Sequence, residues 1–308
     1  MHPLRRGRTL AAALSCLILL GPAPACLAID SWNESVSPHF VIKHESPWMP
    51  PGFTLSLEKI HTRLRMDLSQ FSPWMAKERL TLYLYKERKS YVAGEFSPPE
   101  WSNGLAIYDR KAVAVYDQKE DRKKLLEVIG HETTHLLFES FWSEVGRSPP
   151  TWLNEGLAMM EEGAYAAQPE KSDWYQTMAY WDPKLYMPLA GFFETSPTVD
   201  MKDKGADDKS VAGWYVQAYS LVYYLHRVHS SPLAFKTFCA KIRDGGTLEE
   251  ALWVGYRYKK LAVLEKAWKA WVTDPKHKRN VERVSASANN PGGMATPIEA
   301  RGFNSFRR

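Results

Sequence analysis

The sequence is poor in cysteine and in long apolar runs. It holds 3 cysteines among 308 residues, and two of them, Cys16 and Cys26, lie near the N-terminus. Only Cys239 remains in the rest of the chain, which therefore has no internal disulfide. The main apolar run is Leu10–Leu20, which is too short to span a bilayer, and no other segment is apolar enough to do so. An apolar core must therefore hold the bulk of the chain together.

The chain also has little net charge outside its two ends. Lys and Arg total 40 against 35 Asp and Glu, but residues 29–275 hold 30 basic and 33 acidic side chains. A polyanion-binding core is not supported, and we expect no nucleic-acid partner. The composition, 44% apolar and 24% charged with 12 tryptophans, is typical of a globular chain of one or two domains.

The N-terminal residues 1–28 have the pattern of a signal peptide. Three arginines between residues 5 and 8 precede the apolar run Leu10–Leu20, and Ala23-Pro24-Ala25 follows. The run is about half the ~20 residues that span a bilayer. Cleavage is expected after Ala25 or Ala28, and a lipid on Cys26 would tether the protein to a membrane. We therefore predict a periplasmic or secreted protein.

The apolar periodicity predicts an α+β fold. Residues 29–162 are expected to form a small mixed sheet with helices, and residues 163–210 an irregular, aromatic-rich region. The remainder of 163–275 is expected to be entirely helical, and residues 276–308 to be a basic, disordered tail. The expected strands are 39–44, 79–85, 104–108 and 112–116, and the expected helices are 54–71, 87–96, 121–141, 152–162, 211–229, 232–243, 247–254 and 260–272.

One motif within the expected helix 121–141 carries chemistry. His131-Glu132-Thr133-Thr134-His135 reads H-E-x-x-H. Side chains four residues apart lie on one face of a helix, so both imidazoles can bind one Zn²⁺. Glu132 flanks them and can reach a metal-activated water as a general base. A catalytic zinc needs a third protein ligand, and a second helix follows a Pro-Pro break.

That second helix contains Trp152-Leu153-Asn154-Glu155-Gly156-Leu157-Ala158. H-E-x-x-H followed by Glu in an N-E-G context resembles the gluzincin zinc peptidases, which include thermolysin and the membrane alanyl aminopeptidases. The mature chain is similar to the small bacterial peptidase-MA-like group over residues 36–273. The resemblance implies that Glu155 is the third zinc ligand, beside His131 and His135, with one zinc ion per chain.

The resemblance also implies a residue that stabilises the oxyanion. In the aminopeptidase branch this is a Tyr that opens a helix before an apolar run, and Tyr215 stands in the matching place. Tyr219, one turn later on the same face, is the alternative. Both are also ordinary residues for an aromatic core.

Two departures from the family concern substrate binding and the zinc ligands. The strand Asn103–Ile107 lacks the Gly-x-Met-x-Asn pattern that aminopeptidases carry, which argues against a dedicated aminopeptidase. Met159 stands where thermolysin-like enzymes have an Asp that orients a zinc histidine. That orienting role therefore falls to another residue, and the sequence leaves Glu139 and Glu162 as candidates.

The sequence thus predicts an exported zinc peptidase that hydrolyses peptide or protein substrates. The alternative is a non-catalytic, peptidase-like envelope protein that binds a partner through an aromatic cleft. An intact Glu132 favours the enzyme, because a protein that only binds has no need of the base. Histidines outside the motif, His39 and His61 among them, have no metal-binding spacing and are interpreted as surface or core residues.

Overall fold

The computed structural model describes residues 32–163, 168–197, 205, 207–229 and 231–288. The predicted signal peptide lies outside these residues, as does the part of the basic tail beyond Ala288. Among the helices described, none combines the length and the apolar character that crossing a membrane requires.

The described strands form one five-stranded sheet in the order β1-β2-β3-β5-β4. The central pairs β2–β3 and β3–β5 are parallel, and the outer pairs β1–β2 and β4–β5 are antiparallel. The sheet is therefore mixed, and β4 forms one edge of it. The strands are β1 (Asn33–Val36), β2 (Phe40–His44), β3 (Leu80–Tyr85), β4 (Gly104–Ile107) and β5 (Ala112–Tyr116).

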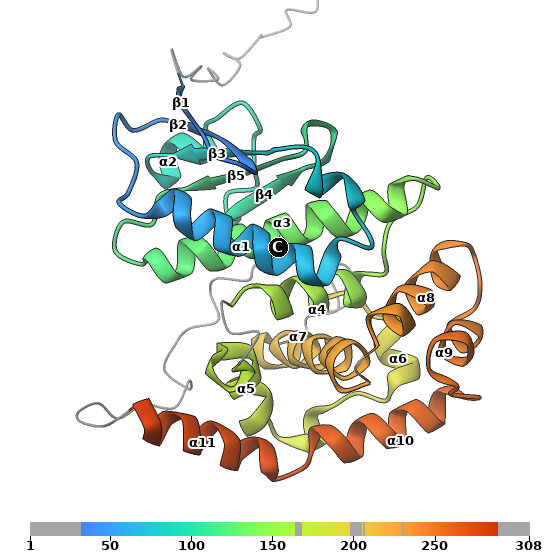
Figure 1. Ribbon diagram of the computed structural model, residues 1–308. Coiled ribbons are helices and arrows are strands. Elements are labelled where there is room, and N and C mark those ends of the chain that lie inside the picture. Colours follow the sequence, from blue (N-terminus) through green and yellow to red (C-terminus); the bar gives the residue numbers. More distant parts are fainter. Residues whose placement is uncertain (1–31, 164–167, 198–204, 206, 230, 289–308) are drawn as a thin grey trace, which may run out of the picture.

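The helices occupy most of the remaining described chain. They are α1 (Phe53–Leu68), α2 (Arg88–Val92), α3 (Arg122–Ser143), α4 (Thr151–Glu161), α5 (Asp173–Tyr180), α6 (Leu189–Phe193), α7 (Asp208–Tyr223), a π-helical turn (Tyr224–Val228), α8 (Pro232–Arg243), α9 (Leu248–Tyr256), α10 (Leu261–Val272) and α11 (Lys276–Ala288). The fold is α+β, with a helical C-terminal half, as the sequence predicts (Figure 1).

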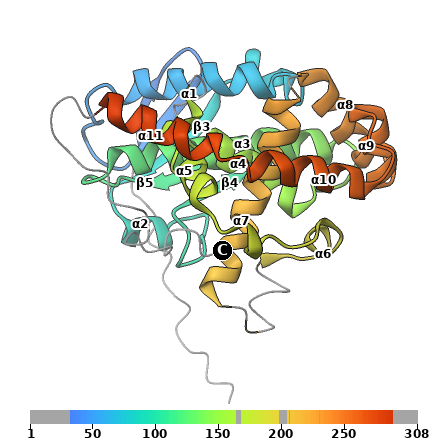
Figure 2. The same cartoon turned by 90° about the horizontal axis from the view of Figure 1, so that it is seen from below.

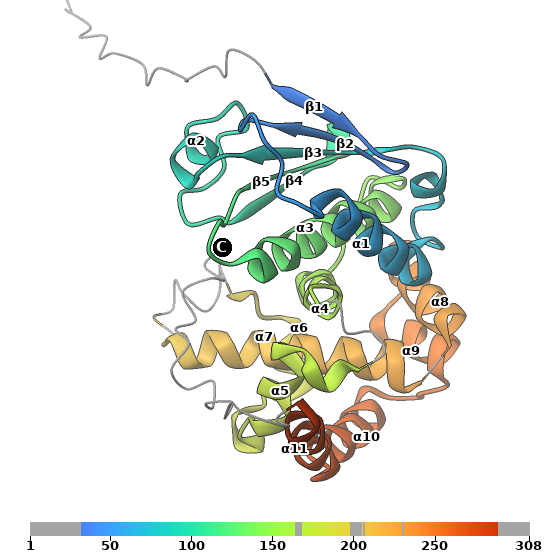
Figure 3. The ribbon, with the colours of Figure 1, turned by 60° about the vertical axis from the view of Figure 1, so that its left-hand side comes forward.

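Both faces of the central strands are covered, which explains their apolar sequences. Successive side chains of β3 alternate between two clusters: Leu82 and Leu84 join the main core, whereas Tyr83 and Tyr85 pack on the other face. On that second face, Tyr91 of α2 packs edge-on against Tyr85. The main core lies beneath the sheet, where α1 and α3 pack side by side (Figure 3).

Successive helical layers follow below α3. Figure 3 shows α4 under α3 and α7 under α4, and α4 is in direct contact with both of its neighbours. The main apolar core runs without interruption from Ile42 of the sheet to Trp268 of α10. Viewed from below, α10 and α11 lie end to end across the near side of the molecule, the side away from the sheet (Figure 2). Helix α3, which carries the H-E-x-x-H motif, thus occupies the centre of the molecule.

Two segments are more regular than the sequence predicts. The aromatic region 163–210, expected to be irregular, contains α5 and α6. The prediction of a disordered tail from residue 276 was wrong for residues 276–288, which form α11. His277 and Val281, one helical turn apart, are buried on its inner face, and Nδ1 of His277 lies 2.7 Å from the Tyr175 hydroxyl of α5. The buried side chains of His277 and Val281 anchor a segment that is mostly polar.

Candidate metal centre

Helix α3 begins with a well-defined cap and is buried along most of its length. The carboxylate of Asp121 accepts a hydrogen bond from the backbone N–H of Lys124 at 2.8 Å, which fixes the first turn. From Leu125 to Trp142, buried side chains occur all round the helix because it lies between the sheet and α4. His131 and His135 are therefore held in the interior of the protein.

The histidines converge on Glu155 of α4. Their Nε2 atoms lie 3.0 Å apart. Nε2 of His131 is 3.8 Å from Oε2 of Glu155, and Nε2 of His135 is 3.8 Å from Oε1 of the same carboxylate. All three side chains are buried. The structure thus brings together the three residues that the sequence predicts as ligands, and such a group could hold a metal ion.

The spacing of these donor atoms fits a single tetrahedral ion. Ligands bound to zinc at ~2.0–2.1 Å lie about 3.3–3.4 Å from one another. The observed separations of 3.0 and 3.8 Å bracket that value. Two imidazole nitrogens and one carboxylate are a donor set that zinc favours, and three protein ligands leave a coordination position open.

Gly156 explains why α4 lies close enough to its neighbours to position Glu155. A Cβ atom at Gly156 would lie 2.6 Å from the carbonyl oxygen of Ala218 and 2.5 Å from a methyl group of Val222, both on α7. Any larger residue would separate α4 from α7. On the other side, Asn154 donates a hydrogen bond to Glu139 of α3 at 3.1 Å. Glu155 is thus positioned by the close contact of Gly156 with α7 on one side and by the hydrogen bond from Asn154 to α3 on the other.

The carboxylate of Glu162 orients His131. Its Oε1 lies 2.8 Å from Nδ1 of His131, and its Oε2 accepts a hydrogen bond from Nε1 of Trp174 at 2.8 Å. With Nδ1 directed to Glu162, Nε2 of His131 is the nitrogen that faces Glu155. Burial raises the pKa of the Glu162 carboxyl to about 7. The sequence leaves Glu139 and Glu162 as candidates for orienting a zinc histidine. In the structure, Glu162 is the one that contacts His131.

Glu132 faces the edge of the sheet. A Cβ atom at Gly104, the first residue of β4, would lie 2.6 Å from Cγ of Glu132 and 2.7 Å from Cγ1 of Val128. The glycine therefore makes room for the Glu132 side chain, which is itself buried. The predicted base thus sits between the metal-binding face of α3 and the edge strand β4.

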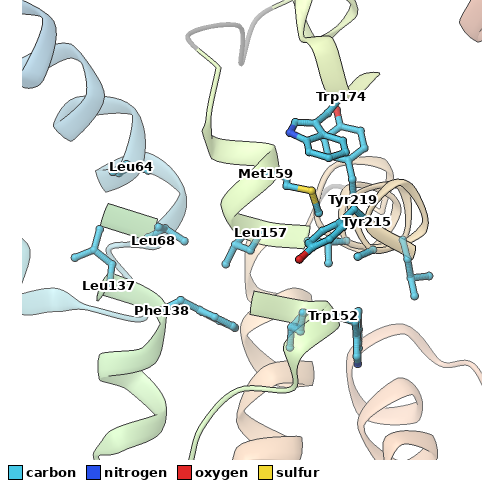
Figure 4. Close-up of a cluster of buried hydrophobic side chains, with 14 of the residues drawn as sticks. Leu64, Leu68, Leu137, Phe138, Trp152, Leu157, Met159, Trp174, Tyr215 and Tyr219 are labelled. Atoms are coloured by element: carbon cyan, nitrogen blue, oxygen red, sulfur yellow. The ribbon is translucent and has the colours of Figure 1, made fainter. Parts of the chain in front are cut away.

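The two tyrosines proposed for the oxyanion lie on α7, the helix that packs along α4. Figure 4 shows Tyr215 and Tyr219 in the apolar cluster between these helices. The Tyr219 ring is stacked on Trp174 with centroids 6.1 Å apart, and burial raises the pKa of its hydroxyl well above the ordinary value. Tyr215 packs edge-on against Trp214. The catalytic role of Tyr215 stays a prediction.

Sequence patterns do not single out two residues of this neighbourhood. Trp174 belongs to the region expected to be irregular, although Ser172 and Asp173 are typical of a helix start and could have indicated α5. Gly104 lies on an expected strand, but its contact with Glu132 joins residues 28 positions apart and leaves no local signal.

The family comparison agrees with this geometry. A family model of the Peptidase MA superfamily matches residues 66–182, a segment that includes α3, α4 and every residue of the cluster formed by His131, His135 and Glu155. Residues 66–182 are therefore similar to the Peptidase MA superfamily, and this similarity supports a metallopeptidase-like fold for that segment. No curated protein matches the chain.

Proposed function

We propose that the protein is a zinc-dependent peptidase. The observation that carries the proposal is the convergence of His131, His135 and Glu155, with Glu132 next to one of the histidines on the same helix. Three protein ligands with a fourth position open are typical of catalytic zinc, whereas structural zinc sites use four. The similarity of residues 66–182 to the Peptidase MA superfamily supports the same class of reaction.

Each residue of the centre has a defined task in this proposal. His131, His135 and Glu155 hold the zinc ion, which supplies a Lewis acid that polarises a peptide carbonyl and acidifies water. The Glu132 carboxylate accepts a proton from the attacking water and delivers it to the leaving amine nitrogen. The Tyr215 hydroxyl donates a hydrogen bond to the oxyanion, and Tyr219 is the alternative donor.

The position of β4 supports a peptide as the substrate. β4 is an edge strand, so the N–H and C=O groups along its open side can pair with an extended peptide. Glu132 packs against Gly104 at the start of this strand. A peptide bound along β4 would therefore pass close to the general base.

We also propose that the enzyme acts outside the cytoplasm, in the periplasm or as a secreted protein. The support is the sequence of residues 1–28, with its basic start, short apolar run and small-residue cleavage zone. Mass spectrometry of the processed N-terminus tests this point. A terminus at Cys26, Leu27 or Ile29 is expected, a diacyl-modified Cys26 would add a membrane tether, and a retained Met1 would contradict export.

Peptidase activity of the purified protein on a mixed peptide library tests the proposal. We expect cleavage that stops when a chelator removes the metal and returns when zinc is restored. A folded protein that binds zinc through His131, His135 and Glu155 but cleaves no peptide would contradict the proposal. That result would favour the alternative, a peptidase-like protein that binds a partner without hydrolysis.

A further inference from the structure

A second group of metal-ligating side chains lies between β2 and α1, away from the centre on α3 and α4. His39 immediately precedes β2, and Glu58 and His61 lie one turn apart on α1. Nδ1 of His39 is 2.6 Å from Oε2 of Glu58. One ligand atom from each of the three residues lies within 4.8 Å of the other two.

The Glu58 carboxylate is held in one orientation. Its Oε1 accepts hydrogen bonds from the Ser37 hydroxyl at 2.6 Å and from the backbone N–H of His39 at 3.1 Å. Oε2 is thereby directed to the His39 ring. Oε1 thus accepts two hydrogen bonds, and an anionic carboxylate is the form that binds metals.

The His61 ring is held in the tautomer that a metal ligand requires. Nε2 donates a hydrogen bond to the carbonyl oxygen of Met75 at 3.1 Å, because a carbonyl can only accept. In the neutral ring, Nδ1 then carries the lone pair that a metal can accept. A backbone carbonyl bound to the second ring nitrogen is the usual support of a metal-binding histidine.

We propose that His39, Glu58 and His61 form a second zinc-binding site. Two imidazoles and one carboxylate are the same donor set as in the first centre, and they suit zinc. The His39 and Glu58 side chains are 31% and 21% exposed, so solvent zinc can reach the site and water can complete its coordination. The ion would link the start of β2 to α1 and would stabilise this side of the sheet.

The stacking of the His39 and His61 rings means that one ring must rotate when zinc binds. The His39 and His61 rings are stacked, with centroids 3.8 Å apart and planes 14° from parallel. A ligated ion lies near the plane of each imidazole, so one ring must turn as zinc binds. His61 is buried and bound to Met75, whereas His39 is partly exposed. His39 therefore turns out of the stack, and the ion takes the place of the proton between its Nδ1 and Glu58.

Zinc titration of the full chain with a chromophoric competitor tests this site. In a His131→Ala/His135→Ala background, which removes the first centre, we expect one zinc ion to remain. Adding His39→Ala or Glu58→Gln should weaken its binding by more than the roughly 10–100-fold that loss of a supporting hydrogen bond costs. His44→Ala, at the far end of β2 and outside the cluster, is the matched control and should leave binding unchanged.

Two outcomes would overturn the second site. One is a background variant that folds, by circular dichroism, and binds no zinc. The other is binding that neither His39→Ala nor Glu58→Gln weakens. His61 is not substituted because it is buried in the core and its loss could unfold α1. The result does not depend on peptidase activity, since the background already lacks both histidines of the first centre.

Discussion

The Glu162 carboxylate lies 2.8 Å from Nδ1 of His131, although the two residues are 31 positions apart and belong to different arms of the α3–α4 hairpin. Thermolysin-like enzymes use an Asp four residues beyond the third ligand for this contact, and here that place holds Met159. Glu162 immediately follows the last residue of α4, and its side chain reaches His131 on α3. Trp174 of α5 fixes its second oxygen. The helical half therefore supports the metal centre directly.

The first prediction concerns this support. Glu162→Ala should weaken zinc binding at the first centre by about 10–100-fold, because His131 loses the partner that fixes its tautomer. Trp174→Phe keeps an aromatic ring but loses the N–H, so a smaller loss is expected. Competition titration with a chelator of known affinity measures both. Unchanged affinity in Glu162→Ala would mean that the contact does not orient the ligand.

The second prediction concerns Gly104. Gly104→Ala should reduce peptidase activity strongly while the first centre still binds its zinc ion, because the new Cβ would displace Glu132. Overpacking of this kind costs about 1–3 kcal/mol of stability. Gly191→Ala is the control, since a Cβ there would meet nothing within 4 Å. Equal activity in both variants would exclude a close contact between residue 104 and the base.

The third prediction concerns α11. Truncation before Lys276 should lower the Tm by at least about 5 °C, because the buried His277 and Val281 contribute several kcal/mol together. Calorimetry of the truncated and full chains measures the difference. Truncation after Ala288 removes only the last 20 residues and should leave the Tm unchanged. A Tm unaffected by the longer truncation would show that α11 is dispensable for stability.

The fourth prediction concerns acid stability. His226, in the π-helical turn, is buried, and neither ring nitrogen has a hydrogen-bond partner in the described residues. Burial, with a contribution from Arg227, lowers its pKa from 6.5 to about 4. Below pH 6.5 the unfolded chain therefore binds a proton that the folded chain does not. The free energy of unfolding should fall by about 3 kcal/mol from this residue between pH 6.5 and pH 4.

His226→Phe should remove this contribution. The ring already packs edge-on against Phe235 at 4.7 Å, so a second phenyl group fits an aromatic contact. Denaturant unfolding at pH 7.5 and pH 5 should show a smaller difference for the variant than for the parent chain. An identical pH dependence would show that His226 is not the group responsible.

Local patterns in the sequence are sufficient to predict much of the fold. The alternation of Leu80, Leu82 and Leu84 indicates β3, and the residues flanking Asp109 indicate the β4–β5 hairpin. By contrast, α11 is strongly polar overall, and His277 and Val281 are its buried residues among those whose burial the structure describes. Its order comes from a tertiary contact, Tyr175 with His277, between residues 102 positions apart.

In the candidate site, too, local sequence patterns predict some features, whereas others depend on tertiary contacts. The H-E-x-x-H spacing is local, so the sequence alone places His131 and His135 on one helix face. The choice between Glu139 and Glu162 cannot be made from the sequence, because it depends on where α4 ends and how it packs on α3. His39 and His61 are 22 positions apart, one beside a strand and the other on a helix, so no spacing rule connects them.

The most direct test of the account is the activity of Glu132→Gln at matched zinc content. The amide preserves the size of the side chain but cannot accept a proton from water. We expect normal folding, unchanged zinc binding at the first centre and a loss of peptide hydrolysis of at least ~10²–10⁴-fold. Hydrolysis at close to the wild-type rate by this variant would contradict the assignment of Glu132 as the base and, with it, the proposed reaction at this centre.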